Sequence, residues 1–126
     1  MTPQATNNGW WVMVPTSLTN QQQQLLLKIA KDSIAYGLAH GKALPINAQD
    51  YPPELQKIRA TFVTLEIAGQ LRGCIGMLEA VQPLITDVAN NAFLAAFRDP
   101  RFPAVSETEY PKLEIHISIL SLSEPV

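Results

Sequence analysis

The only cysteine of the chain, Cys74, lies in a short segment whose residue types could do chemistry. Residues 71–76 read Leu-Arg-Gly-Cys-Ile-Gly, so the thiol lies two positions after a permanent cation, Arg72. A neighbouring positive charge stabilises the thiolate, which is the nucleophilic and metal-binding form of cysteine. Gly73 and Gly76 remove side chains near the sulfur, which lets a ligand or another backbone approach closely. We therefore take Cys74 and Arg72 as candidate catalytic residues, and Gly73 and Gly76 as candidate ligand-binding residues.

A second interpretation of Cys74 is purely structural, because a free cysteine most often behaves as a small buried hydrophobe. A two-residue turn at residues 69–70, with glycine first as in a type II′ turn, places Cys74 opposite Leu65 on the apolar face of a hairpin. Arg72 shares that face in this register, and a buried charge without a partner is costly. A bulge at Gly69 or Gly73 turns both side chains outward instead. The residues leave the two interpretations open.

A charged segment at residues 98–103 holds two more arginines. The planar guanidinium group suits carboxylate and phosphate, so Arg72 and Arg101 are candidates for binding an anionic ligand. The alternative is a loop salt bridge that closes the end of the preceding helix, and we favour that role for Asp99. For Arg72 and Arg101 the sequence does not decide between anion binding and a structural salt bridge.

The two histidines give a weaker signal. His116 is expected on the outward face of the last strand, between Glu114 and Ser118, where a solvated position is favoured. A relay from Cys74 through His116 to Glu114 would follow the general logic of an activated nucleophile. Two histidines and one cysteine without close spacing predict no zinc site. The sequence identifies no cofactor.

The elements that must position these residues follow from periodicity and from helix-end signals. Thr19 and Gln22 form a capping-box pattern before an apolar helical repeat, and Gly41 is a suitable stop. Alternating apolar residues indicate a hairpin and a later strand. We expect helices over residues 20–40 and 83–98, and strands over residues 61–67, 71–77 and 113–120. The predicted class is α+β, in the order α-β-β-α-β.

The composition limits the classes of protein to which the chain can belong. A chain of 126 residues predicts one domain, here residues 19–126, after an N-terminal tail and docking segment at residues 1–18. Charged residues make up 16%, against roughly 25% in an average soluble domain, so part of the surface is expected to be covered by a partner. The net charge is −2 and no long basic cluster occurs, which argues against nucleic acid and membrane surfaces. One cysteine and an N-terminus without a basic signal region predict a cytoplasmic protein.

The segment at residues 71–76, followed by Asp-Pro-Arg-Phe-Pro at residues 99–103, resembles the AMMECR domain family. The similarity extends over residues 21–124 and is strongest to the prokaryotic branch called AmmeMemoRadiSam system protein A. The resemblance implies a cytoplasmic α+β protein whose Arg-Gly-Cys-Ile-Gly segment lies near a cleft. It also implies two partners, a Memo-type protein and a radical S-adenosylmethionine protein, and it implies no known reaction.

The family domain usually continues for several tens of residues beyond the point that matches Val126. We therefore expect a domain that is incomplete at its C-terminus, with an open edge or a bare apolar face on the 113–120 strand or on the hairpin. Such surfaces self-associate unless covered, so a homo-oligomer or a complementing fragment is expected. The expected function is that of an interaction component. The alternative is an enzyme, or part of one, that uses Cys74 as nucleophile or ligand.

Overall fold

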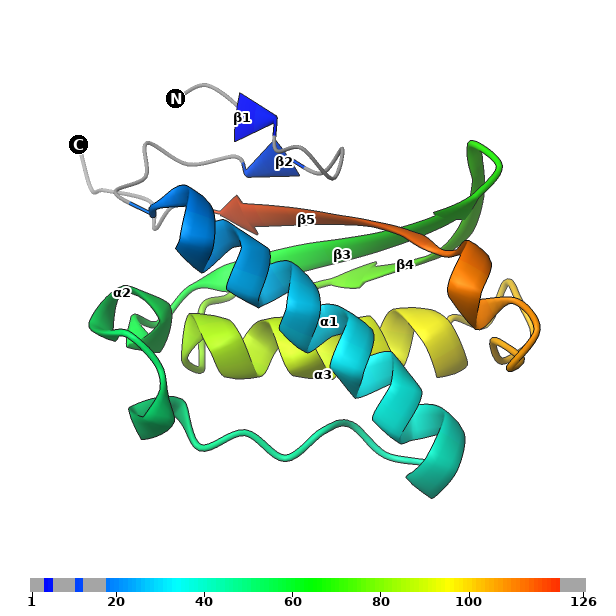
Figure 1. Ribbon diagram of the computed structural model, residues 1–126, viewed down its shortest axis with the longest axis horizontal. Coiled ribbons are helices and arrows are strands. Elements are labelled where there is room, and N and C mark those ends of the chain that lie inside the picture. The colour runs from blue at the N-terminus through cyan, green and yellow to red at the C-terminus, as the bar shows by residue number, and fades with distance from the viewer. Residues whose placement is uncertain (1–3, 6–10, 13–17, 121–126) are drawn as a thin grey trace.

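The computed structural model describes residues 4–5, 11–12 and 18–120 (Figure 1). The helices are α1 (Asn20–His40), α2 (Pro53–Gln56) and α3 (Leu84–Phe97), with short 3₁₀ turns η1 (Ala48–Asp50) and η2 (Tyr110–Lys112). The strands are β1 (Gln4–Ala5), β2 (Trp11–Val12), β3 (Ala60–Ile67), β4 (Gln70–Gly76) and β5 (Glu114–Leu120). From α1 onward, the α+β class and the order of the main elements are those predicted from the sequence.

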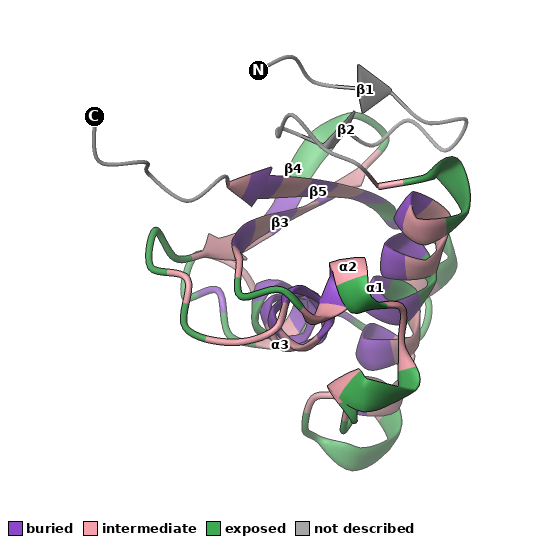
Figure 2. Cartoon of the chain, turned by 90° about the vertical axis from the view of Figure 1, so that its left-hand side faces the viewer, coloured by how far each residue is buried: buried purple, intermediate pink, exposed green. Residues whose placement is uncertain are grey.

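Two layers build the domain: an antiparallel sheet and a pair of helices on one of its faces. The sheet has the strand order β4-β3-β5, so β3 is central and both neighbours run antiparallel to it. Helix α3 packs against β3 and β4, while α1 packs against α3 and β5 (Figures 1 and 2). The core lies between the layers and is made of aliphatic side chains from both, among them Leu26, Ile34, Leu65, Val88 and Ile117.

Helix α1 begins and ends where its local signals predict. The Thr19 hydroxyl accepts a hydrogen bond from the backbone N–H of Gln22, and the Gln22 side chain accepts one from the N–H of Thr19. This reciprocal capping box satisfies two of the backbone donors that a helix start leaves free. At the other end Gly41 adopts a left-handed conformation with φ of 72° and donates to the carbonyl of Gly37.

A buried polar cluster joins the start of α3 to β3. The Asp87 carboxylate accepts hydrogen bonds from the Thr61 hydroxyl at 2.7 Å, from the Asn91 amide at 3.1 Å and from the Gln82 amide at 2.8 Å. Thr61, Asp87 and Asn91 are all buried. Because buried polar groups are costly unless paired, these bonds fix how α3 lies against the sheet.

The hairpin that carries the cysteine differs from the sequence prediction in its turn and its register. The two turn residues are Ala68 and Gly69, both with positive φ, rather than residues 69–70. A bulge between the pairs Leu65–Gly73 and Glu66–Leu71 then leaves Arg72 as the extra residue. Together the two changes place Cys74 opposite Thr64, so the predicted pairing of Cys74 with Leu65 is wrong.

The predicted N-terminal tail and docking segment, residues 1–18, lies mostly outside the described residues. Its described backbone forms the two-stranded pair β1–β2, and β2 lies beside β5 (Figure 1). Within the part of the chain that the structure describes, no helix combines the length and apolar character needed to cross a bilayer.

Candidate functional site

The segment at residues 71–76 lies in β4, an edge strand of the sheet that packs over α3. A side chain at Gly73 would bring its Cβ within 2.1 Å of the Ala95 carbonyl oxygen on α3. The glycine therefore lets helix and strand approach closely. Gly76 has a comparable role on the opposite face, because its missing side chain makes room for the Phe62 ring of the neighbouring strand.

Cys74 lies on the face of the sheet that points away from α1 and α3, where it is half-buried. We call this the outer face; its central residues alternate with the core residues of the strands and are Phe62, Thr64, Glu66, Cys74, Gly76, His116 and Ser118, and Ala60, Leu71, Glu114 and Leu120 lie at its ends. The Cys74 sulfur is 3.2 Å from the Thr64 hydroxyl oxygen across the hairpin. The thiol is thus neither a core residue nor fully exposed.

Asp99, in the loop after α3, holds the backbone of Cys74. Its carboxylate is almost fully buried and accepts a hydrogen bond at 3.0 Å from the Cys74 N–H. The same carboxylate accepts bonds from the Arg101 guanidinium, at 2.8 and 3.0 Å, and from the Arg101 N–H. These bonds from Arg101 hold the pKa of Asp99 well below its usual range. Asp99 thus forms a salt bridge within the loop and also links Arg101 to the cysteine.

Arg72 is buried, and its charge is paired. It donates two hydrogen bonds to the Glu109 carboxylate, at 2.9 and 3.0 Å, and a third at 2.8 Å to the Pro103 carbonyl. The bidentate contact raises the pKa of Arg72 and lowers that of Glu109 to about 2. The nitrogen Nη1 of Arg72 is buried and has no hydrogen-bond partner among the described residues.

The loop at residues 98–109 is therefore fastened to β4 by the Arg72–Glu109 ion pair and by the hydrogen bond from the Cys74 N–H to Asp99. Phe102 lies in this loop, with the guanidinium carbons of Arg72 and Arg101 at 5.8 and 5.4 Å from its ring centroid. Both distances are within the range of cation–π attraction. Each guanidinium already contacts a carboxylate, so an anionic ligand would have to compete with Asp99 or Glu109 for either arginine.

His116 occupies the outer face of β5, in the same row as Thr64 and Cys74. Strand spacing of about 4.8 Å puts the backbone of His116 roughly 10 Å from that of Cys74, with Thr64 between them. The nearby carboxylate is Glu66, whose Oε1 is 3.3 Å from Nε2, rather than the predicted Glu114. This contact lacks hydrogen-bond geometry, so it becomes an ion pair only when the imidazole is protonated.

Sequence reasoning missed two residues of this site, Thr64 and Glu109. Thr64 could not be identified because its contact with Cys74 depends on the bulge. Glu109 had a usable signal: Ser106 and Glu109 have the spacing of a capping box, and the Ser106 N–H donates to the Glu109 carboxylate at 3.0 Å. Among the described residues no three histidine, cysteine or acidic side chains are grouped closely enough to hold a metal ion.

The elements define an α+β domain in which two helices cover one face of a three-stranded antiparallel sheet and a cysteine lies on the other. The solved structure of an uncharacterised protein from Pyrococcus horikoshii, PH0010, matches this fold with a TM-score of 0.77 and 32% identity. That match covers 88% of this chain and 57% of the other.

The family model for AMMECR1 matches residues 27–126, so the chain belongs to the AMMECR1 family. A relative from Methanothermobacter thermautotrophicus is 39% identical over 109 residues, which are 86% of this chain and 56% of the relative. One from Thermotoga maritima is 47% identical over 81 residues, 62% of this chain and 47% of the relative. The chain spans about half the length of the curated relatives that it matches.

Proposed function

We propose that the chain is an interaction component that binds a protein partner through the outer face of its sheet. The observation that carries this proposal is the make-up of that face. Its centre combines an aromatic ring, hydroxyls, a thiol and an imidazole with one carboxylate, Glu66, all half-buried, and no described helix lies over it. A mixed apolar and polar surface with few charges is typical of the centre of a protein–protein interface.

The state of the two arginines supports docking over catalysis. Arg72 and Arg101 are each bound to a carboxylate, and the histidine of the face lies two strands from the thiol. A nucleophilic site needs a base within hydrogen-bond reach of the nucleophile. In this arrangement the ion pairs hold the loop and Cys74 in place, and the outer face supplies the contact surface.

The partners that we propose are the two implied by the resemblance, a Memo-type protein and a radical S-adenosylmethionine protein. The membership in the AMMECR1 family supports this choice. We further propose that the chain works in the cytoplasm, where the proposed partners would be found and where a free thiol stays reduced. A second copy of the chain is the competing occupant of the same face, and its binding would show as a homo-oligomer.

The test measures binding of the chain to each partner encoded in the same genome, by calorimetry and by size-exclusion chromatography with light scattering. Thr64→Arg places a long cation in the middle of the outer face and should weaken binding at least tenfold. Gln21→Arg introduces the same charge on the exposed first turn of α1 and should leave binding unchanged. Cys74→Ala should also bind normally. Equal affinity of the Thr64→Arg and Gln21→Arg proteins would refute the proposal, provided that both unfold at the wild-type temperature.

A second candidate function is thiol chemistry at Cys74, and the contact with Thr64 favours it. A hydroxyl at 3.2 Å can donate to the thiolate and stabilise it. In that case Thr64→Val should slow alkylation of Cys74 by iodoacetamide several-fold, and Cys74→Ala should abolish the effect of the chain on its partners. An unchanged alkylation rate, with partner function intact in Cys74→Ala, would exclude this candidate.

A further inference from the structure

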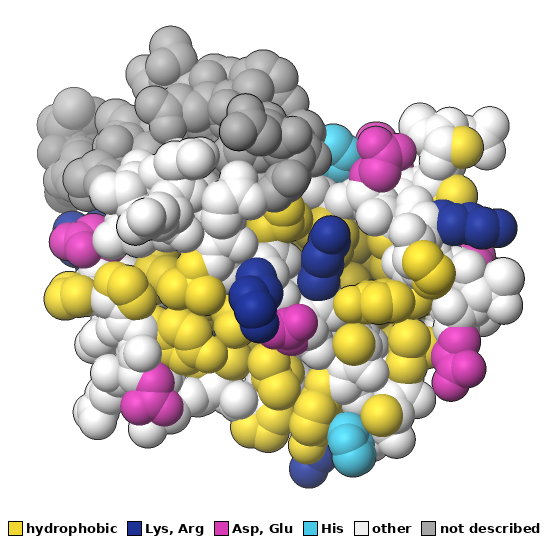
Figure 3. All heavy atoms as spheres, in the orientation of Figure 1, with side chains coloured by type: hydrophobic (Ala, Val, Ile, Leu, Met, Phe, Trp, Pro, Cys, Tyr) yellow, Lys and Arg dark blue, Asp and Glu magenta, His cyan; other side chains and the backbone are white. Residues whose placement is uncertain are grey.

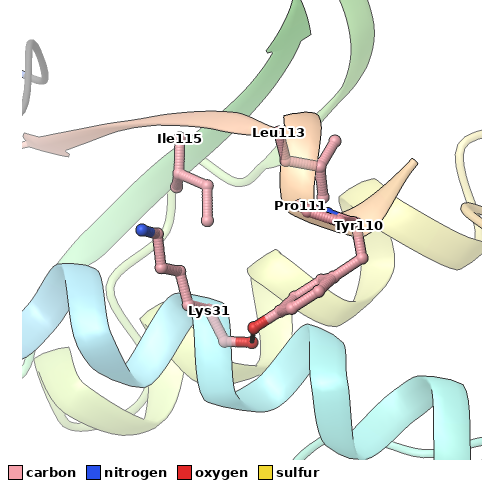
Figure 4. Close-up of a pocket in the computed structure, with 5 residues that line it drawn as sticks. All are labelled: Lys31, Tyr110, Pro111, Leu113 and Ile115. Carbon is pink, nitrogen blue, oxygen red and sulfur yellow. Dashed lines mark hydrogen bonds between the residues drawn. The ribbon is translucent and has the colours of Figure 1, made fainter. Parts of the chain in front are cut away.

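A pocket separate from the outer face lies on the helix side of the sheet, between α1 and β5. It has a volume of about 90 Å³ and is lined by Lys31 of α1, by Tyr110 and Pro111 of η2, by Leu113 just before β5 and by Ile115 of β5. In Figure 4 the Lys31 side chain and the Tyr110 ring flank the open space beneath the strand. Figure 3 shows apolar side chains gathered between the same two elements.

The walls of the pocket are fixed by the fold. Leu113 and Ile115 are buried core residues, so their positions are set by packing. The Tyr110 hydroxyl donates to the Lys31 backbone carbonyl at 3.1 Å, which holds the ring against α1. Partial burial and the negative charge of Asp32 raise the pKa of Tyr110, so the hydroxyl remains a donor at neutral pH. A pocket that is already formed loses little entropy when it is filled.

The lining of the pocket includes one charged group, Lys31. Lys31 is exposed and makes no ion pair with any residue that the structure describes. The neighbouring carboxylate of Asp32 is taken by Lys28, at 2.6 Å. A free ammonium beside an apolar pocket is complementary to a ligand that has a small apolar group next to a carboxylate.

The strand above the pocket narrows the choice of ligand. β5 is at the edge of the sheet, and β2 lies beside it without pairing with it. Among the described residues no strand pairs with this outer edge, and the proposed ligand would pair with its backbone groups as an added strand. Addition of an extended peptide to a sheet edge, with its terminal carboxylate captured nearby, is a recurring mode of recognition.

We propose that the pocket between α1 and β5 binds the C-terminal residue of an extended peptide. The terminal carboxylate pairs with the Lys31 ammonium, the last side chain enters between Tyr110 and Ile115, and the preceding residues pair with the edge of β5. The pocket is smaller than the cavity of about 150 Å³ that admits benzene. A branched aliphatic side chain such as valine suits it, and an aromatic one does not.

The experiment is a titration of the ¹⁵N-labelled chain, followed by NMR, with an acetylated pentapeptide that ends in valine. We expect saturable shifts of the backbone amides at residues 113–116 and of Lys31. Binding should fall at least tenfold for the C-terminally amidated peptide, for the same peptide ending in phenylalanine and for N-acetylvaline. Lys31→Met should weaken binding at least fivefold, whereas the control Lys42→Met, at an exposed lysine just beyond the end of α1, should leave it unchanged.

Several results would overturn the proposal. Equal binding of the acid and the amide, or equal effects of Lys31→Met and Lys42→Met, would show that the terminal carboxylate does not pair with Lys31. If N-acetylvaline binds as tightly as the peptide, the preceding residues do not pair with β5. If no saturable shifts appear, the pocket does not bind the peptide. Thr64→Arg alters only the outer face, so it should not change peptide binding. The proposal for this pocket and the proposal for the outer face can therefore be refuted independently.

Discussion

Adding a single methyl group at Gly73 should destabilise the fold by about 3 kcal/mol. The Cβ of an alanine would lie 2.1 Å from the Ala95 carbonyl oxygen, whereas ordinary contact begins at 3.4 Å. Helix α3 and strand β4 would therefore have to separate by about 1.3 Å, the difference between these distances. Extra volume in a close-packed interior costs typically about 1–3 kcal/mol. We expect the upper end of that range, because the obstacle is backbone and cannot rotate away.

Thermal and urea unfolding of Gly73→Ala measure this loss directly. At about 2–4 °C per kcal/mol, the midpoint should fall by roughly 10 °C. The matched control is Gly69→Ala in the hairpin turn, where a Cβ meets no atom within 4 Å and only the positive φ of 78° is unfavourable. That control should lose about 1 kcal/mol. If Gly73→Ala is no less stable than Gly69→Ala, the close approach of α3 to β4 is wrong.

Three further predictions concern the ion pairs, the buried polar cluster and the first helix. Because Arg72 lowers the pKa of Glu109 from 4.5 to about 2, the pair contributes its stability above pH 4.5 and loses it as the pH falls toward 2. Urea unfolding should therefore be less pH-dependent over that range in Arg72→Met, and an unchanged dependence would contradict the pairing. Asp87→Ala leaves buried donors unpaired and should cost about 2–3 kcal/mol in urea unfolding, against no more than about 0.5 for the exposed control Glu107→Ala; similar losses would show that the cluster is not buried. Thr19→Ala removes the cap of α1 and should cost about 1 kcal/mol, and a neutral result would mean that the capping box does not form.

The ends of α1 could be predicted from sequence because the interactions that set them are local. The capping box joins Thr19 and Gln22, three residues apart, and Gly41 supplies the left-handed residue that ends the helix. The alternation of apolar residues likewise identifies the strands, because only a pleated strand places every second residue in the core. These signals need no knowledge of the rest of the fold.

The hairpin register could not be predicted, because two local choices decide it. Ala68 takes a positive φ of 52°, which is uncommon for a residue other than glycine, so the sequence favoured a turn that starts at Gly69. The bulge at Arg72 depends on contacts made far away, with Glu109 and the Pro103 carbonyl. Moving the turn and adding the bulge place Cys74 on the outer face rather than in the core.

The sequence could identify the candidate residues of the site but not the distant contacts that position them. The sequence singled out Cys74, Arg72 and Arg101, and the structure does bring both arginines into one assembly with the cysteine through the loop after α3. The partners of the arginines could not be deduced, since Arg72 and Glu109 are 37 positions apart. The role of Gly73 as a packing residue likewise appears only when α3 is placed beneath the strand.

The most direct test of the docking proposal uses Cys74 as a reporter, since it is the only thiol in the chain. Its rate of alkylation by iodoacetamide is measured alone and with a saturating amount of each proposed partner, with binding verified in the same sample by light scattering. The account predicts that the bound partner slows alkylation at least tenfold, because it covers the outer face. A complex that forms while Cys74 reacts at its free rate would show that the partner binds elsewhere, and would contradict the central claim.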